Sequence, residues 1–269
     1  MKFEEATKRV ESGEFTDKFR ILKLAYKDGL TIAHMQVVNG WRTENRKVLA
    51  LADKYGKSVA HIQAHQGWTT EDTRILKLAD KSGETVAHVQ AWRDWTTEDP
   101  EILKLTNSDG RSVAHVQARK GWTTEDPEIL KLTNSNGRSV AHVQAWKGWT
   151  TEDPEILRLA DDEGNTVAHY QAYRGWTTED PNVLALANKE GQTVAHEQTL
   201  WSSWIINDPM LLKLANARGI PVAHVQAKHG WTTEDQEILD LVDKEGQTVA
   251  DIIDRYGKWR RSKEQHGVS

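Results

Sequence analysis

Eight histidines recur at a nearly constant spacing, and imidazole is the side chain best suited to bind a transition metal or move protons near neutral pH. They are His34, His61, His88, His115, His142, His169, His196 and His224. Successive members lie 27 residues apart, with a single step of 28 between His196 and His224. A metal site is disfavoured, because neighbouring copies would lie about one helix spacing apart and no second ligand shares each unit's face at ligand spacing. We therefore interpret the row as structural, and expect no metal and no cofactor.

Carboxylate pairs recur as well, and two adjacent carboxylates could perform acid–base catalysis. They belong to the motif Trp-Thr-Thr-Glu-Asp, perfect in six copies, of which Glu125 and Asp126 are one example. Six equivalent copies argue against a single catalytic site, whereas acidic residues suit the N-terminus of a helix. No glycine-rich phosphate loop, nucleophile elbow or metal signature occurs. We expect a protein that is not an enzyme.

Repetition at a period of this length indicates a stacked array of identical units. In one unit, Ser112 suits the N-cap of a first helix at 113–120, and Gly121 suits its end. Asp126 and Pro127 suit the N-cap and first position of a second helix. The positions expected to carry that second helix are Ile129, Leu130, Leu132 and Thr133. No stretch alternates as a strand would. The sequence predicts an all-α fold, an αα-solenoid of about nine 27-residue helix-turn-helix repeats.

The segment from Asp109 to Gly121 reads Asp-Gly-Arg-Ser-Val-Ala-His-Val-Gln-Ala-Arg-Lys-Gly and resembles the first half of an ankyrin repeat. The period is shorter than that family's 33 residues. Val113 and Ala114 replace its proline and leucine, and the hairpin segment is missing. The chain therefore resembles a hairpin-less, ankyrin-like array. The resemblance implies that the histidine is structural and that variable positions line a concave binding face.

Three segments are expected along the chain. Residues 1–28 form an N-terminal capping repeat with Thr7 at the histidine position, and residues 29–246 form the ankyrin-like array. Residues 247–269 form a C-terminal capping helix and a frayed tail, with Asp251 at the histidine position.

Two further rows accompany the histidines. The glutamines are Gln36, Gln63, Gln90, Gln117, Gln144, Gln171, Gln198 and Gln226, and the tryptophans are Trp41, Trp68, Trp95, Trp122, Trp149, Trp176, Trp204 and Trp231. Buried glutamines would need hydrogen-bond partners, which a ladder between successive units could provide. Each tryptophan is expected to be a wedge between units, with its indole N–H bonded locally.

The residues just before each helix-ending glycine vary while the frame does not. Cations there could merely complement the helix dipole, which leaves the aromatic residues unexplained. Tryptophan, tyrosine and arginine are enriched in interface hot spots, which favours a binding surface. The candidate partner-binding residues are Trp92, Arg93, Arg119, Lys120, Trp146, Lys147, Tyr173, Arg174, Leu200, Trp201, Ile205 and Ile206.

One unit breaks the frame at 199–208, which carries the extra residue. Ile205 and Ile206 replace the usual Thr-Thr, and Glu197 replaces an aliphatic residue. An apolar cluster in a connector indicates a partner contact, and local repacking around the insertion is the alternative.

Composition bounds the function. The chain has 269 residues, a net charge of −5 and no cysteine, and no apolar run reaches membrane-spanning length. We expect a cytoplasmic, non-catalytic scaffold that binds a partner protein and inhibits or scaffolds it. A nucleic-acid binder is the alternative, since basic residues interleave with aromatic ones as in stacking surfaces. The net negative charge disfavours it. Self-association through the patch at 200–206 is a third hypothesis.

Overall fold

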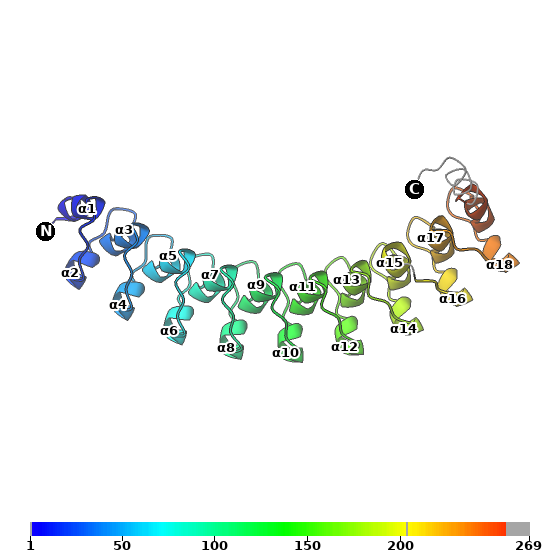
Figure 1. Ribbon diagram of the computed structural model, residues 1–269, viewed down its shortest axis with the longest axis horizontal. Coiled ribbons are helices and arrows are strands. Elements are labelled where there is room, and N and C mark those ends of the chain that lie inside the picture. Colours follow the sequence, from blue (N-terminus) through cyan, green and yellow to red (C-terminus); the bar gives the residue numbers. More distant parts are fainter. Residues whose placement is uncertain (1, 203, 257–269) are drawn as a thin grey trace, which may run out of the picture. The chain divides into compact units, whose positions relative to one another are not determined.

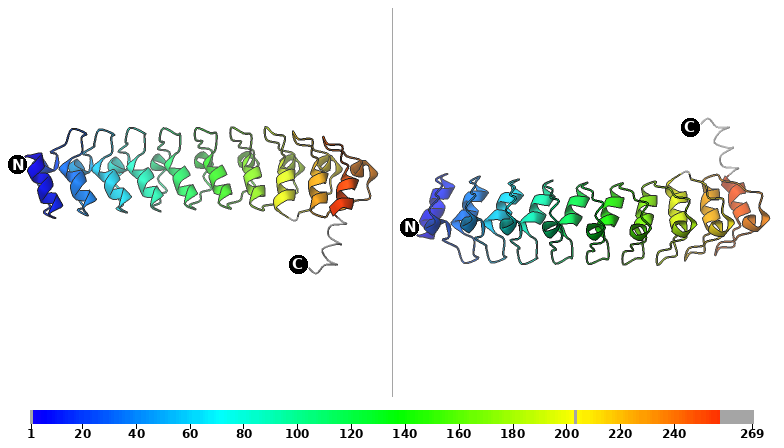
Figure 2. Two further views of the ribbon diagram at one scale, coloured as in Figure 1. Left: turned by 90° about the horizontal axis from the view of Figure 1, so that it is seen from above. Right: turned by 90° about the horizontal axis from the view of Figure 1, so that it is seen from below.

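The computed structural model describes residues 2–202 and 204–256, and within them the regular secondary structure is entirely helical. Longer helices, called A helices here, alternate with single-turn B helices (Figures 1 and 2). The A helices are α1 (Phe3–Glu11), α3 (Ile32–Val38), α5 (Val59–His65), α7 (Val86–Trp92), α9 (Val113–Arg119), α11 (Val140–Trp146), α13 (Val167–Tyr173), α15 (Val194–Trp201) and α17 (Val222–Lys228). The B helices are α2 (Phe19–Leu22), α4 (Arg46–Leu49), α6 (Thr73–Leu76), α8 (Pro100–Leu103), α10 (Pro127–Leu130), α12 (Pro154–Leu157), α14 (Pro181–Leu184), α16 (Pro209–Leu212) and α18 (Gln236–Leu239). The predicted all-α solenoid of helix pairs is confirmed.

The chain divides into two compact units, Met1–Ser135 and Asn136–Ser269. Within each unit, consecutive A helices pack against one another, and most of them also pack against the B helix that precedes them in the chain. The three expected segments, 1–28, 29–246 and 247–269, remain predictions, because the division at residue 135 follows none of their boundaries. Within the part of the chain that the structure describes, no helix is long and apolar enough to cross a membrane.

The A helices begin and end where the sequence predicts. In α9, the Ser112 side chain accepts a hydrogen bond from the backbone N–H of His115, and the imidazole in turn accepts one from the Ser112 N–H. This reciprocal capping box satisfies two of the donors that a helix start leaves unpaired. Gly121 ends the helix with a φ of 101°, and its N–H donates to the Ala118 carbonyl. A left-handed conformation of this kind favours glycine.

The B helices are shorter than predicted. Helix α10 is capped by Asp126, whose side chain accepts from the Glu128 N–H, and it ends at Leu130. Leu132 and Thr133 therefore lie beyond it. In the equivalent segment one repeat earlier, the Leu105 carbonyl accepts from Val113 N–H, and a single antiparallel bridge follows at Thr106 and Ser112. A single bridge thus accompanies the return of the chain to the next A helix.

The core consists of small residues on the A helices and larger aliphatic residues on the B helices. Val113, Ala114 and Ala118 are fully buried. Ile102 and Leu103 on α8 are almost fully buried. Alanines four residues apart leave one face of the helix flat, so that neighbouring A helices can approach closely. Helices of four to eight residues are unstable alone, so this packing holds them in place.

The two ends depart from the histidine frame. Thr7, at the histidine position of α1, bonds the Phe3 carbonyl. Asp251, in a helical stretch at 249–256, rebuilds the cap with Thr248: each accepts from the other's backbone N–H, at 2.9 and 3.0 Å. The predicted frayed tail lies outside the described residues.

Candidate binding surface

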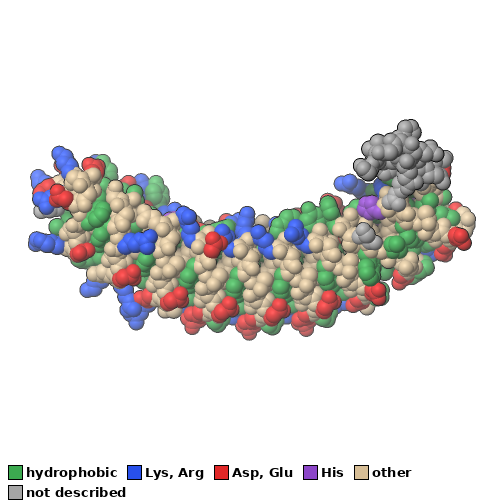
Figure 3. All heavy atoms as spheres, in the orientation of Figure 1, with side chains coloured by type: hydrophobic (Ala, Val, Ile, Leu, Met, Phe, Trp, Pro, Cys, Tyr) green, Lys and Arg blue, Asp and Glu red, His purple; other side chains and the backbone are tan. Residues whose placement is uncertain are grey.

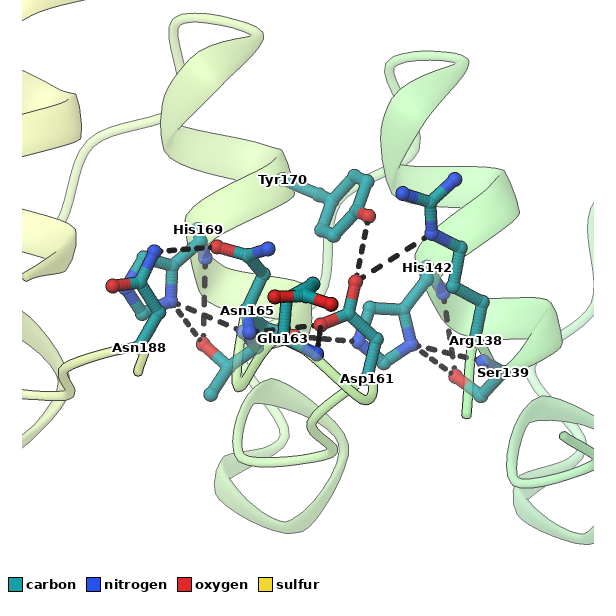
Figure 4. A network of polar contacts seen from close by, with 10 residues as sticks. Arg138, Ser139, His142, Asp161, Glu163, Asn165, His169, Tyr170 and Asn188 are labelled. Carbon is teal, nitrogen blue, oxygen red and sulfur yellow. Dashed lines mark hydrogen bonds and ion pairs between the residues drawn. The ribbon is translucent and has the colours of Figure 1, made fainter. Parts of the chain in front are cut away.

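The histidine row joins consecutive repeats. The Nδ1 atom of His142 accepts from the N–H and the hydroxyl of Ser139, at 3.0 and 2.7 Å (Figure 4). Its Nε2–H donates to the backbone carbonyl of Asn165, one repeat further on, at 3.1 Å. These partners fix the neutral tautomer that carries its proton on Nε2. The predicted bond to the cap hydroxyl is confirmed, whereas the bond to the next repeat was not predicted, because its acceptor is the backbone of a variable residue.

The same inter-repeat bond recurs in both units. The acceptors are the carbonyls of Lys57, Glu84, Arg111, Asn165, Gln192, Ile220 and Gln247. His224 differs at its other nitrogen. Its cap position is Pro221, which has neither an N–H nor a hydroxyl to offer, and the buried Nδ1 atom has no partner.

Burial disfavours the charged form of several capping histidines. It lowers the pKa of His142 to about 4, against the opposing effect of the bond to the Asn165 carbonyl. Burial likewise lowers the pKa of His34, His61, His88, His169 and His196. Both ring nitrogens of His142 are engaged, so neither has a lone pair left for a substrate or a metal. No cluster of three metal-ligating side chains occurs within residues 2–202 and 204–256.

The glutamine and tryptophan rows bind the preceding repeat. The Gln63 side chain pairs with both backbone groups of Thr43: its oxygen accepts from the N–H at 3.0 Å and its nitrogen donates to the carbonyl at 3.2 Å. The Trp122 indole N–H donates to the Glu98 carboxylate, 24 residues earlier, at 2.9 Å. The predicted glutamine ladder is present at Gln63 and its equivalents Gln36, Gln198 and Gln226, whereas both side-chain atoms of the buried Gln90 amide lack a partner. The prediction that the indole N–H bonds locally is wrong, because its acceptor is the glutamate of Trp-Thr-Thr-Glu-Asp in the preceding repeat. That glutamate therefore has a structural role.

In the first unit, side chains of the variable face contact one another. Trp92 is half-buried, and the Arg119 guanidinium lies 5.6 Å from its ring centroid. Lys120 forms an ion pair with Asp94 at 2.8 Å. Asp94 occupies the position of a helix-ending glycine with a φ of 68°. Of the predicted binding residues here, Arg93, Arg119 and Lys120 are exposed.

In the second unit, the variable face presents a continuous aromatic row. Trp146 and Tyr173 are stacked, with centroids 5.1 Å apart and an interplanar angle of 11°. Trp201 meets Tyr173 edge-on at 4.7 Å. The exposed fractions of the three side chains are 48, 38 and 54 %. Lys147 and Arg174 are exposed beside them. We call Trp146, Tyr173 and Trp201 the aromatic row.

The irregular connector is only partly exposed. Leu200 and Ile205 are 41 and 52 % exposed, whereas Ile206 is 4 % exposed. The prediction that Ile206 belongs to an exposed cluster is therefore wrong. The Gln226 side chain pairs with both backbone groups of Ile206, at 2.6 and 3.0 Å, as Gln63 does with Thr43, and the isoleucine side chain is buried here.

The insertion changes how α15 ends. Its C-cap residue, Ser202, has an extended backbone conformation. The other A helices are instead followed by a residue in the left-handed conformation. A cavity of about 360 Å³ lies between this end and the next repeat, lined in part by Leu200, Trp204 and Trp231. The usual glutamate acceptor for the Trp231 indole is replaced by Asn207. The cavity thus lies at the frame break.

At the repeat position immediately after the capping histidine, two repeats depart from the usual residue type. The other units carry Met35, Ile62, Val89, Val116, Val143 and Val225 there, whereas α13 has Tyr170 and α15 has Glu197. Tyr170 was not predicted, although comparison of the repeats with one another would have found it. Its hydroxyl donates to Asp161 at 2.9 Å, and burial, then this bond, raises the pKa of Tyr170 to about 12. Arg138 lies 3.5 Å from the same carboxylate oxygen (Figure 4).

Glu197 lies beside the aromatic row. It is half-buried, and its carboxylate accepts from the Trp201 indole N–H at 3.0 Å. Burial raises the pKa of Glu197, an effect that the bond from Trp201 opposes. A carboxylate therefore stands at the edge of an otherwise aromatic surface.

No protein-family model matches the chain, and no curated protein matches its sequence.

Proposed function

We propose that the chain is a non-catalytic scaffold that binds a partner protein through the aromatic row, and that it acts by occluding or scaffolding that partner. One observation carries the proposal: the row is exposed, yet none of its members takes part in the bonds that join the repeats. Large aromatic side chains offer contact area with few rotatable bonds to freeze, and they dominate interface hot spots. The ankyrin-like pattern of Asp109 to Gly121 supports the same function. We also propose a cytoplasmic setting, in keeping with a sequence that has no cysteine.

The basic residues of the variable face support nucleic acid as a second candidate. Figure 3 shows many lysine and arginine side chains on the side of the A helices, whereas aspartate and glutamate predominate on the side of the B helices, where basic side chains also lie toward the N-terminal end. The net charge of −5 is thus unevenly distributed. Two of the predicted cations are already engaged in the first unit, Arg119 with Trp92 and Lys120 with Asp94. This engagement favours protein over phosphate as the ligand.

Site-specific photocrosslinking in the native host separates the candidates. Tyr173→p-benzoyl-phenylalanine places a crosslinker in the aromatic row, and Tyr55→p-benzoyl-phenylalanine places one at an exposed position in the other unit. We expect one discrete protein adduct from position 173, none from position 55, and loss of the adduct with Trp146→Ala. An adduct with nucleic acid would reverse the ranking. A crosslinked dimer of the chain would favour self-association, for which Leu200 and Ile205 are the exposed apolar residues.

A further inference from the structure

A small cavity opens between three A helices of the second unit. It measures about 190 Å³ and is lined by Trp146 from α11, Tyr170 and Tyr173 from α13, and Glu197 from α15. Asn165 and His169 complete it. The Trp146 and Tyr170 rings meet edge-on with centroids 6.1 Å apart. The two residues that break the frame after the capping histidine therefore converge on one cavity, against the aromatic row.

The charges around this cavity are unequal. Asp161 is buried and already faces Arg138 and the Tyr170 hydroxyl. His169 is neutral, since its Nδ1 accepts from the Thr166 N–H and its Nε2 donates to the Gln192 carbonyl. Within the described residues, no lysine or arginine pairs with Glu197. The cavity thus combines three aromatic rings with one carboxylate that lacks a counter-charge.

We propose that this cavity binds an alkylammonium group, namely a lysine side chain, methylated or not, of the partner protein. The inference rests on the proposed function and specifies what the partner presents. Aromatic faces attract cations, most strongly where water is displaced. An apolar side chain would bury the Glu197 carboxylate further, with only the neutral donors Trp201 and Gln192 to compensate its charge, and an acidic one would be repelled by it. The half-buried carboxylate, whose pKa burial raises, regains a favourable environment when a cation lies beside it.

Short peptides test this inference without knowledge of the partner. The probes are blocked pentapeptides with lysine, trimethyllysine, norleucine or glutamate between glycines. The readout is the NMR signal of the indole N–H groups, because the Trp201 indole bonds Glu197 directly. We expect saturable shifts of the Trp146 and Trp201 signals with lysine or trimethyllysine only. Equal shifts with norleucine, or no saturable shift with any peptide, would overturn the proposal.

The frame supplies a substitution that should leave the fold intact. Glu197→Val places at this position the residue that Val143 and Val225 already provide elsewhere. It should weaken binding of the lysine peptide about tenfold, which corresponds to about 1.4 kcal/mol, with an unchanged melting temperature. Glu190→Gln, an exposed carboxylate on the loop before α15, is the matched control and should leave affinity unchanged. Equal affinity for the wild type and Glu197→Val would rule out the carboxylate's role.

The two proposals fail in different ways. If the crosslinked partner is lost with Trp146→Ala but retained with Glu197→Val, the protein-binding function stands and the cation site does not. If the lysine peptide binds in a manner that depends on Glu197 while position 173 captures no protein, the cavity is real and the proposed function fails.

Discussion

At the scale of single residues, one chemical type plays two different parts according to its place in the repeat. Trp122 bonds Glu98 of the preceding repeat through its indole, whereas Trp146 stacks on Tyr173 and remains 48 % exposed. The first contributes to the junction between repeats, and the second is free to contact a partner. Substitution should therefore separate stability from binding.

Trp122→Ala should lower the free energy of unfolding by roughly 2 kcal/mol, because it removes half-buried apolar area and the hydrogen bond to the exposed Glu98. Trp146→Ala should cost less than about 1 kcal/mol, the scale of one aromatic contact. It should instead weaken partner binding by about 2 kcal/mol if it is a hot spot. Paired measurements of melting temperature and affinity decide the matter. A folding defect confined to Trp146→Ala would mean that the two rows have been assigned the wrong way round.

Pro221 offers a substitution in the opposite direction. Pro221→Thr would supply the N–H and the hydroxyl that the Nδ1 atom of His224 lacks, and so restore the cap present on α15. We expect a gain of about 1 kcal/mol in unfolding free energy, reduced somewhat by the greater freedom of the unfolded chain. Chemical denaturation measures it. Thr193→Pro, the reverse change at the equivalent position of α15, should destabilise the protein, and a stable Thr193→Pro variant would contradict this account.

At the scale of elements, the sequence was most informative where local chemistry alone decides the structure. Ser112, His115 and Gly121 predict both ends of an A helix, because capping and left-handed backbone depend on neighbours in the chain. The sequence predicts a longer B helix than the structure has, because Leu132 continues the apolar spacing of Ile129 and Leu130. Residues at the Leu132 position instead lie in the extended segment that leads back to the next A helix. Helix propensity alone does not predict where the chain leaves the helix for such a segment. Ile206 was misplaced for a related reason, since its burial depends on Gln226 in the following repeat.

The two glycines of each repeat have different structural requirements. Gly110 and Gly121 both have a positive φ, of 68° and 101°. A Cβ atom at Gly110 would lie 2.9 Å from the backbone nitrogen of Ser135, whereas one at Gly121 would meet nothing within 4 Å. Gly121→Ala should cost only the strain of a left-handed residue, about 1–2 kcal/mol. Gly110→Ala should cost clearly more, because it also pushes two loops apart.

Thermal unfolding of the two glycine variants provides the comparison. Asp94, which has a positive φ at the position equivalent to Gly121, provides a reference for a non-glycine residue within the same chain. Equal destabilisation by both substitutions would show that the approach of the loops imposes no constraint.

At the scale of the whole molecule, the buried histidines make stability depend on pH. An unfolded imidazole titrates near 6.5, whereas folded His142 accepts a proton only near pH 4. Between these values the unfolded chain binds more protons, so the unfolding free energy falls as pH decreases from about 6.5 towards 4. His142 alone contributes about 3 kcal/mol to this loss. Five more capping histidines shift in the same direction and steepen it.

Denaturation at a series of pH values, combined with the measured uptake of protons on unfolding, tests this dependence. The number of protons taken up should rise well above one near pH 5, and His142→Gln should reduce it by about one. The carboxylates of Asp80 and Asp161, whose pKa values lie below the ordinary range, contribute only at lower pH. A melting temperature that stays constant between pH 7.5 and 5 would contradict the neutral state assigned to the histidines.

The junctions between repeats also have a genetic consequence. The bonds between repeats share their offsets: histidine generally reaches 23 residues forward, glutamine 20 back and tryptophan 24 back, although the Gln90 amide makes no such bond. The inserted residue of 199–208 changes one of these, from 23 to 24 for His196, and the following repeat resumes the usual spacing. Recombination that adds or deletes 27 codons would therefore leave each bond with a partner. Such a gene can change length by whole repeats and acquire a new aromatic or acidic position with each copy, while the frame that holds the copies together stays the same.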